Sequence, residues 1–171
     1  MDFLDLAKRR HSVRTFKRER VGIEDVQRIL ESARVAPTAA NKQPVRLVVA
    51  QDPDTLSRLS KTADLYGAPL AILVCADKTR AWVRPSDGKS TSDIDAAIAC
   101  DHMMMEATSL DLGSVWICWF DAEAIRKELD LPDELEPVNI LAIGYSAESP
   151  SDPNRFARDR ISVDRLTNIR R

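Results

Sequence analysis

The residues best suited to chemistry lie near the start of the chain, in the segment from Lys8 to Arg14. Within five residues this segment supplies two guanidinium groups, an imidazole and a hydroxyl, which belong to Arg10, His11, Ser12 and Arg14. Such donors suit phosphate, because the planar fork of an arginine can meet two phosphate oxygens at once. The segment therefore predicts an anion site, and a solvated basic patch is the alternative.

Side chains must bind this phosphate, because the chain offers no glycine-rich loop. Its five glycines are far apart in sequence, which excludes a Walker loop and a GxGxxG turn. If the backbone is extended, Arg10, Ser12 and Arg14 point to one side. Arg158 and Arg160 repeat the alternate spacing near the C-terminus. The two groups together are the best candidates for a phosphate clamp.

A polar turn from Ala36 to Pro44 is the second candidate segment. The side chains of Asn41 and Gln43 carry both donors and acceptors, as the edge of a flavin or nucleobase ring requires. The alternative is an ordinary helix-to-strand connection, since turn formation alone explains Pro37, Asn41 and Pro44. It explains Gln43 less well.

Hydrophobic periodicity predicts the elements that position these segments. We expect helices over residues 2–10, 23–34, 53–61, 93–112 and 121–129, and strands over residues 45–50, 70–75, 114–120 and 138–145. The continuous apolar run at 70–75 is typical of a strand covered on both faces. Gly113 is expected to end the helix before it. Residues 77–92 form a long loop, in which Trp82 either covers a bound substrate or anchors the loop.

The predicted helix over residues 93–112 is apolar around much of its circumference. A helix of this kind is normally buried, and a chain of 171 residues cannot easily complete that burial in one subunit. We therefore expect this helix to lie at a dimer interface. Beyond about residue 146 the periodicity ends, which predicts an extended tail that docks on another surface.

Composition limits the class of protein. A chain of 171 residues fits one domain spanning residues 1–171, and its net charge of −2 argues against a general nucleic-acid binder. No apolar run reaches the length of a membrane span, and Asp2 and Asp5 interrupt any signal peptide. Cys75, Cys100 and Cys118 lie in apolar runs, so we expect buried thiols in a reducing, cytoplasmic setting without membrane contact.

Other chemistries have weaker support. His102 and Glu106 are four residues apart on a predicted helix, a spacing compatible with metal ligands. His11 is the only other histidine, so we expect no metal site. The chain has no Gly-x-Ser-x-Gly elbow, and its cysteines lack the electropositive, exposed setting of a catalytic thiolate. We therefore assign no side chain as a catalytic acid, base or nucleophile.

Five motifs, in order, resemble the FMN-dependent nitroreductase family from Phe3 to about Leu166. They are Arg-Arg-His-Ser-x-Arg, Ala-Pro-Thr-Ala-x-Asn-x-Gln-Pro, Leu-x-Leu-Gly-Ser-x-Trp-Ile, Ile-Gly-Tyr and Arg-x-Arg. The resemblance implies an α+β fold, with a central mixed or antiparallel sheet flanked by helices, in an intertwined homodimer with FMN at the subunit interface. Val45 and Asp111 depart from the family pattern, which affects the expected substrate pocket more than the flavin site.

The same resemblance implies a role for each candidate residue. The FMN phosphate would be held by residues of the N-terminal segment and the tail, namely Arg10, His11, Ser12, Arg14, Arg158 and Arg160. The flavin would be contacted from the second subunit by residues of the polar turn, namely Pro37, Thr38, Ala39 and Asn41. The strand residues Val115 and Trp116 would lie along the isoalloxazine ring.

The implied activity is an NAD(P)H-dependent, ping-pong reduction of a nitroaromatic or quinone-type acceptor through FMN, in which the flavin carries the chemistry. One alternative is a flavin-binding carrier or sensor without turnover, and another is a flavin enzyme of different chemistry on the same fold. A nucleic-acid-binding module could use the seven basic residues between 8 and 20, although Phe16 is the single aromatic residue among them. The sequence leaves open the acceptor and the choice between NADH and NADPH.

Overall fold

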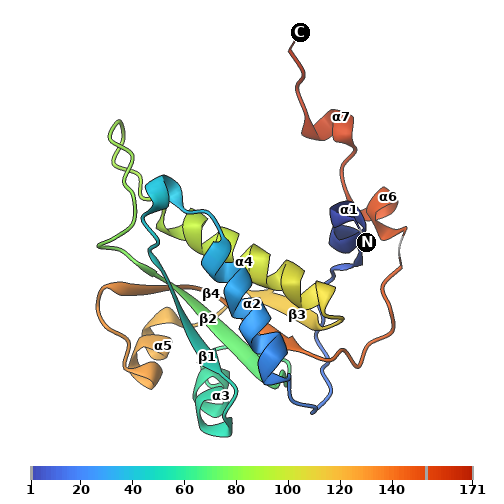
Figure 1. Ribbon diagram of the computed structural model, residues 1–171, viewed down its shortest axis with the longest axis horizontal. Coiled ribbons are helices and arrows are strands. Elements are labelled where there is room, and N and C mark those ends of the chain that lie inside the picture. The colour runs from blue at the N-terminus through green and yellow to red at the C-terminus, as the bar shows by residue number, and fades with distance from the viewer. Residues whose placement is uncertain (1, 153, 171) are drawn as a thin grey trace.

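The computed structural model describes residues 2–152 and 154–170. Within these residues a four-stranded antiparallel sheet, in the order β1-β2-β4-β3, lies at the centre (Figure 1). Its strands are β1 (Val45–Ala50), β2 (Leu70–Asp77), β3 (Gly113–Ile117) and β4 (Leu135–Gly144). This architecture confirms the predicted α+β fold, in the antiparallel form of the sheet.

Helices cover both faces of the sheet. One face packs against α2 (Ile23–Val35) and α4 (Ser92–Ser109), and the other against α3 (Pro53–Ser60) and α5 (Ala122–Leu129). Every residue of β2 is buried, because this strand is central and both of its faces are covered. The central place of β2 in the sheet explains why its sequence is a continuous apolar run.

The N-terminal segment extends the sheet at its β3 edge. Helix α1 (Phe3–Arg9) begins at Asp2, whose carboxylate accepts the backbone N–H of Asp5 at 2.8 Å. After α1 the backbone is extended, and the N–H of Val13 donates to the carbonyl of Ser114 at 2.9 Å. A Cβ on Gly113 would lie 2.7 Å from the nearest Val13 methyl group. Glycine therefore permits the close approach that places the basic segment beside β3.

The end of α4 differs from the prediction that Gly113 caps it. The helix ends at Ser109, and Asp111 adopts the left-handed conformation with φ of 59°. The N–H of Leu112 then donates back to the carbonyl of Ala107 at 2.9 Å, which is the longer bond of a Schellman motif. The prediction was wrong because Gly113 does not end this helix. A glycine is needed at this position because Val13 packs closely against it.

The predicted loop over residues 77–92 contains a hairpin. Val83 pairs with Ser90, and the N–H of Arg84 donates to the carbonyl of Lys89 at 2.9 Å. Figure 1 shows this hairpin projecting from the body near the start of α4.

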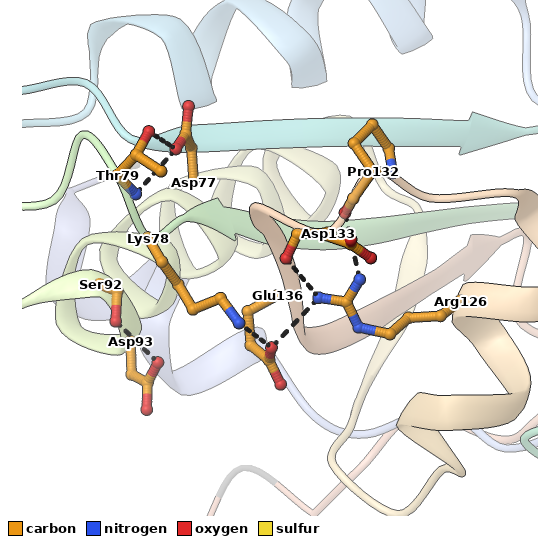
Figure 2. A network of polar contacts seen from close by, with 9 residues as sticks. All are labelled: Asp77, Lys78, Thr79, Ser92, Asp93, Arg126, Pro132, Asp133 and Glu136. Atoms are coloured by element: carbon orange, nitrogen blue, oxygen red, sulfur yellow. Dashed lines mark hydrogen bonds and ion pairs between the residues drawn. The ribbon is translucent and has the colours of Figure 1, made fainter.

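Ion pairs hold the chain where it leaves β2 (Figure 2). Glu136 accepts hydrogen bonds from Lys78 at 3.0 Å and from Arg126 at 3.4 Å. The Lys78 ammonium, followed by the Arg126 guanidinium, holds the pKa of Glu136 below its usual value. Arg126 also donates to the carbonyls of Pro132 and Asp133, at 3.1 Å each. This network ties the residue after β2 to the start of β4.

The tail is less extended than predicted and contains two short helices. Ser146 pairs with Phe16, after which α6 (Arg155–Asp159) and α7 (Val163–Leu166) follow. Every described residue from Ala157 to Arg170 is exposed. Figure 1 shows α6 beside α1 and the rest of the tail leaving the body. We call residues 157–170 the arm.

The three cysteines differ in exposure. Cys75 and Cys100 are buried, whereas Cys118 is exposed. The prediction of three buried thiols was therefore wrong at Cys118, because β3 ends one residue earlier. Burial raises the pKa of Cys75 to about 11 and raises that of Cys100 further.

This difference predicts selective labelling. At about pH 8 an aromatic disulfide reagent should modify one thiol per folded chain, at Cys118, and all three thiols after unfolding. The absorbance of the released chromophore measures the number of reactive thiols in the folded and in the unfolded protein. Cys118→Ser should abolish the reaction of the folded protein, and rapid labelling of Cys100 in that variant would contradict the burial.

None of the helices in residues 2–152 and 154–170 combines the length and apolar content needed to cross a bilayer.

Candidate functional site

Four of the predicted phosphate-binding residues meet at one small cavity beside the end of α1. The cavity has a volume of about 220 Å³, and its lining consists of Arg10, His11, Ser12, Arg155, Phe156, Asp159 and Arg160. The predicted members of this set are Arg10, His11, Ser12 and Arg160. The tertiary structure thus brings the N-terminal segment and the tail together.

The charges around this cavity favour an anion. Arg10 is half-buried, and burial lowers its pKa, as do the nearby guanidinium groups of Arg155 and Arg160. Asp101 offsets only part of this effect. Arginine nevertheless stays charged at neutral pH, so three cations face one another here, with Asp159 as the one carboxylate in the lining. An anion in the cavity would relieve their repulsion.

His11 offers a further donor at the same place. Its Nδ1 lies 3.2 Å from the carbonyl oxygen of Arg9. Among the described residues, nothing partners the buried Nε2. If Nδ1 donates to that carbonyl, Nε2 is an acceptor in the neutral ring and a donor in the protonated ring. A phosphate oxygen would satisfy the protonated form.

Arg155 is a residue of this cavity that the sequence analysis did not select. It donates to the carbonyls of Lys8 at 2.7 Å and Arg10 at 2.8 Å. Its guanidinium also stacks over Phe156, 4.1 Å from the ring centre. Arg155 thereby fastens α6 to the N-terminal segment. The adjacent aromatic residue was the available signal, but it does not reveal which carbonyls the arginine reaches.

Two predicted residues lie outside the lining of this cavity. Arg14 is exposed, and its backbone N–H donates to the Glu148 carboxylate at 2.6 Å. The guanidinium of Arg158 is bound to Asp159 at 2.8 Å. The alternate spacing of Arg158 and Arg160 points both to one side only in an extended chain. Because α6 is helical up to Asp159, that premise does not hold.

A second cavity of about 500 Å³ adjoins the first and shares Arg10, His11 and Arg155 with it. The apolar side chains of Val13 and Leu112 form part of its wall. Together the two cavities leave room for a ligand larger than a phosphate ion, with a cationic end and a partly apolar wall.

The polar turn lies at the opposite end of α4. Its members are Pro37, Thr38, Ala39 and Asn41, and η1 (Ala39–Asn41) forms its centre. The N–H of Ala39 donates to Asp95 near the start of α4, whereas Arg9 of α1 donates to the Thr108 carbonyl near its end. These anchor points are separated by roughly 20 Å of helix. Within one protomer the turn and the phosphate cavity are therefore separate.

The two strand candidates face opposite sides of β3. Val115 is 3% exposed and belongs to the core under α3 and α5, so its side chain is not available to a ligand. Trp116 is partly buried and packs against the core under α4.

The described residues contain no group of three or more His, Cys, Asp or Glu that could hold a metal ion. The ring of His102, the weak metal candidate, contacts the Ile98 carbonyl through Nδ1 at 2.9 Å.

Comparison with known proteins places these observations in a family context. The model of the Nitroreductase family matches residues 7–64 and 57–145. A protein of Archaeoglobus fulgidus, named "Putative NADH dehydrogenase/NAD(P)H nitroreductase", is 31% identical, over 92% of this chain and 91% of its own length.

Two solved structures extend the comparison. A nitroreductase family protein of Clostridium difficile 630 is 47% identical, with a TM-score of 0.96 over 98% of both chains. An FMN-dependent nitroreductase of Clostridium difficile R20291 is 28% identical, with a TM-score of 0.77 over 93% of this chain and 98% of that one.

Proposed function

Because this chain belongs to the Nitroreductase family, and so is an NAD(P)H-dependent oxidoreductase that uses FMN, we propose that the cavity beside α1 holds the FMN phosphate. The electron acceptor that we propose is a nitroaromatic or quinone-type molecule, reduced in a ping-pong cycle. Bound FMN supplies the two-electron transfer itself. The protein supplies binding and orientation, and no side chain is assigned as acid or base.

One observation carries this proposal: Arg10, Arg155 and Arg160 line one cavity together with His11, whose buried Nε2 has no partner among the described residues. A phosphate dianion would pair with Arg10 and Arg160, while the Ser12 hydroxyl could donate a further bond. We assign Arg155 to holding the tail in place, since its guanidinium already donates to two backbone carbonyls. Arg14 and Arg158 remain outer members of the proposed phosphate site.

We further propose that the site is completed by a second copy of the chain. The turn and the cavity lie at opposite ends of α4, so a twofold axis near the middle of α4 would bring one protomer's turn toward its partner's cavity. Pro37, Thr38, Ala39 and Asn41 would then contact the flavin across the interface. The β3 backbone at Val115 and Trp116 would lie along the same ring.

The arm supports this dimer. Four large apolar side chains on it are between 61% and 74% exposed, namely Ile161, Val163, Leu166 and Ile169. Exposed apolar side chains grouped in this way indicate an interaction surface. Arg155 and Arg160 hold the start of the tail beside the cavity of their own protomer. We propose that the rest of the arm, residues 161–170, lies on the partner, which would give an intertwined dimer.

The proposal predicts that purified protein is yellow and that FMN stabilises the apoprotein. At FMN concentrations of about 100 times Kd, binding should add about 2.7 kcal/mol to the free energy of unfolding. For a chain of this size that corresponds to a rise in Tm of roughly 5–10 °C. Visible spectra and a thermal melt measure both effects, with riboflavin as the phosphate-free control. A colourless protein that neither gains flavin bands nor shifts in Tm would refute the proposal.

Turnover needs a separate measurement. Steady-state oxidation of NADH and NADPH with a panel of quinones and nitroaromatics should identify an acceptor and give the parallel double-reciprocal lines of a ping-pong cycle. Uniformly slow oxidation by a yellow protein would instead indicate a flavin carrier or sensor.

A further inference from the structure

The polar turn has an unusual backbone. Ala40, Asn41 and Gln43 have φ values of 49°, 52° and 51°. Residues with a Cβ seldom adopt this left-handed conformation, and such positions persist only where the surroundings impose them. Within the turn, the hydroxyl of Thr38 accepts the N–H of Gln43 at 3.0 Å. The turn therefore depends on specific contacts for its shape.

The contact that supports the turn from outside comes from Asp95, in the first turns of α4. This residue is 1% exposed. Its Oδ1 accepts the N–H of Ala39 at 2.9 Å, and its Oδ2 accepts the hydroxyl of Thr91 at 3.3 Å. The partly positive start of α4 favours a carboxylate at this place. Asp95 thus joins the helix to the first residue of η1.

The same carboxylate is linked to the hairpin loop. The backbone N–H of Thr91 donates to the carbonyl of Trp82 at 3.0 Å. The Thr91 hydroxyl lies 3.1 Å from the same carbonyl and 3.3 Å from the Asp95 carboxylate, so its single proton is shared between these two acceptors. Turn, helix and loop therefore meet at one buried acidic group.

Stability alone is a poor explanation for this buried acid. A buried charged group is weak evidence for stability, because the cost of removing it from water can exceed what its contacts return. Asp95 also is not the cap of its helix, which is Thr91. What its carboxylate does provide is a fixed position for the N–H of Ala39, and hence for the turn that we assign to the flavin.

We propose that Asp95 is a positioning residue for the flavin ring. By holding Ala39 it keeps the turn in the conformation with which Thr38 and Asn41 meet the cofactor. This proposal rests on the proposed function above, and it concerns the ring end of the cofactor. The phosphate end is held by a different set of residues, so the two ends can be tested separately.

The test compares FMN with riboflavin, by fluorescence titration of the folded dimer. Asp95→Leu should weaken binding of both flavins by the same factor, about tenfold or more. The long-wavelength flavin absorption band should also shift toward its position in water. Asp95→Asn should bind both flavins within about threefold of the wild type, because its amide oxygen still accepts the Ala39 N–H.

The matched control is Asp93→Leu, two positions away on the exposed side of the same helix. Figure 2 shows Asp93 beside Ser92, whose hydroxyl donates to it at 3.2 Å. This variant should bind both flavins like the wild type. If Asp95→Leu fails to fold, Thr91→Val keeps the side-chain shape and removes the hydroxyl that Asp95 shares with the Trp82 carbonyl. This variant should weaken the binding of both flavins about threefold.

Several outcomes would overturn the role of Asp95. The first is unchanged flavin affinity with an unshifted absorption band in Asp95→Leu, or in Thr91→Val where that variant replaces it. The second is a loss of affinity that is confined to FMN. The third is an equal loss of affinity in Asp93→Leu. In each of these cases wild-type FMN binding would leave the proposed function intact. If the wild type itself binds neither flavin, the proposed function fails, and the role of Asp95 fails with it.

Discussion

Replacing Arg10 with alanine is expected to weaken FMN binding by about 100-fold, while the affinity for riboflavin stays unchanged. Arg10 is the half-buried member of the arginine cluster, and a charge-assisted contact of a desolvated arginine with phosphate is worth about 3 kcal/mol. Riboflavin lacks the phosphate, so its affinity should not depend on Arg10. Fluorescence titration of both ligands measures the difference.

Arg14→Ala is the control for this experiment, because Arg14 is exposed and lies outside the cavity lining. It should lose far less FMN affinity than Arg10→Ala. Arg10→Lys should be intermediate, since lysine keeps the charge but loses the planar fork. Equal losses in Arg10→Ala and Arg14→Ala would contradict the site described above.

The apoprotein gives an independent check on the same cluster. Because burial, followed by Arg155 and Arg160, disfavours the charged form of Arg10, Arg10→Ala should not lower the Tm of the apoprotein. The variant should instead lose most of the rise in Tm that FMN produces.

Replacing Val163 and Leu166 with serine is expected to raise the dimer Kd by about 1000-fold. Both side chains are 70% exposed in the arm, and burial on the partner would be worth at least about 1 kcal/mol for each. Two arms bury four such side chains per dimer, so the loss is about 4 kcal/mol. Sedimentation velocity over a range of protein concentrations measures the change.

Arg165→Ser, on the same short helix, is the matched control and should leave the dimer intact. FMN affinity should fall together with dimerisation in the double variant, because the turn that we assign to the ring comes from the partner. A double variant that remains a tight dimer would show that the arm docks elsewhere.

Local patterns predicted much of this molecule. The strand β1 and the helices α2 and α3 lie within one residue of the expected bounds, because burial of one face gives each element a periodicity that neighbouring residues reveal. Donor chemistry is also local: Arg10, His11 and Ser12 could be selected as phosphate ligands from their types and spacing.

The structure differs from the expectations where a residue contacts a distant segment. Gly113 is adjacent to a helix end, but its small size is required by Val13, a hundred positions earlier. Arg158 was selected by spacing, whereas Arg155 reaches the cavity because α6 docks on the end of α1. Such contacts depend on how elements that are remote in the sequence pack together. The hydrophobic periodicity of each element carries no information about that packing.

The chain's residue types and their periodicity therefore established which groups could bind a phosphate and which segments form helices and strands. The tertiary structure established which of those groups meet. It joined Arg10 to Arg160 and placed the polar turn roughly 20 Å along α4 from them, with Asp95 beneath the turn. The physical reason is that side-chain chemistry and hydrophobic alternation are properties of short stretches, whereas a binding site depends on how rigid elements of fixed length pack together.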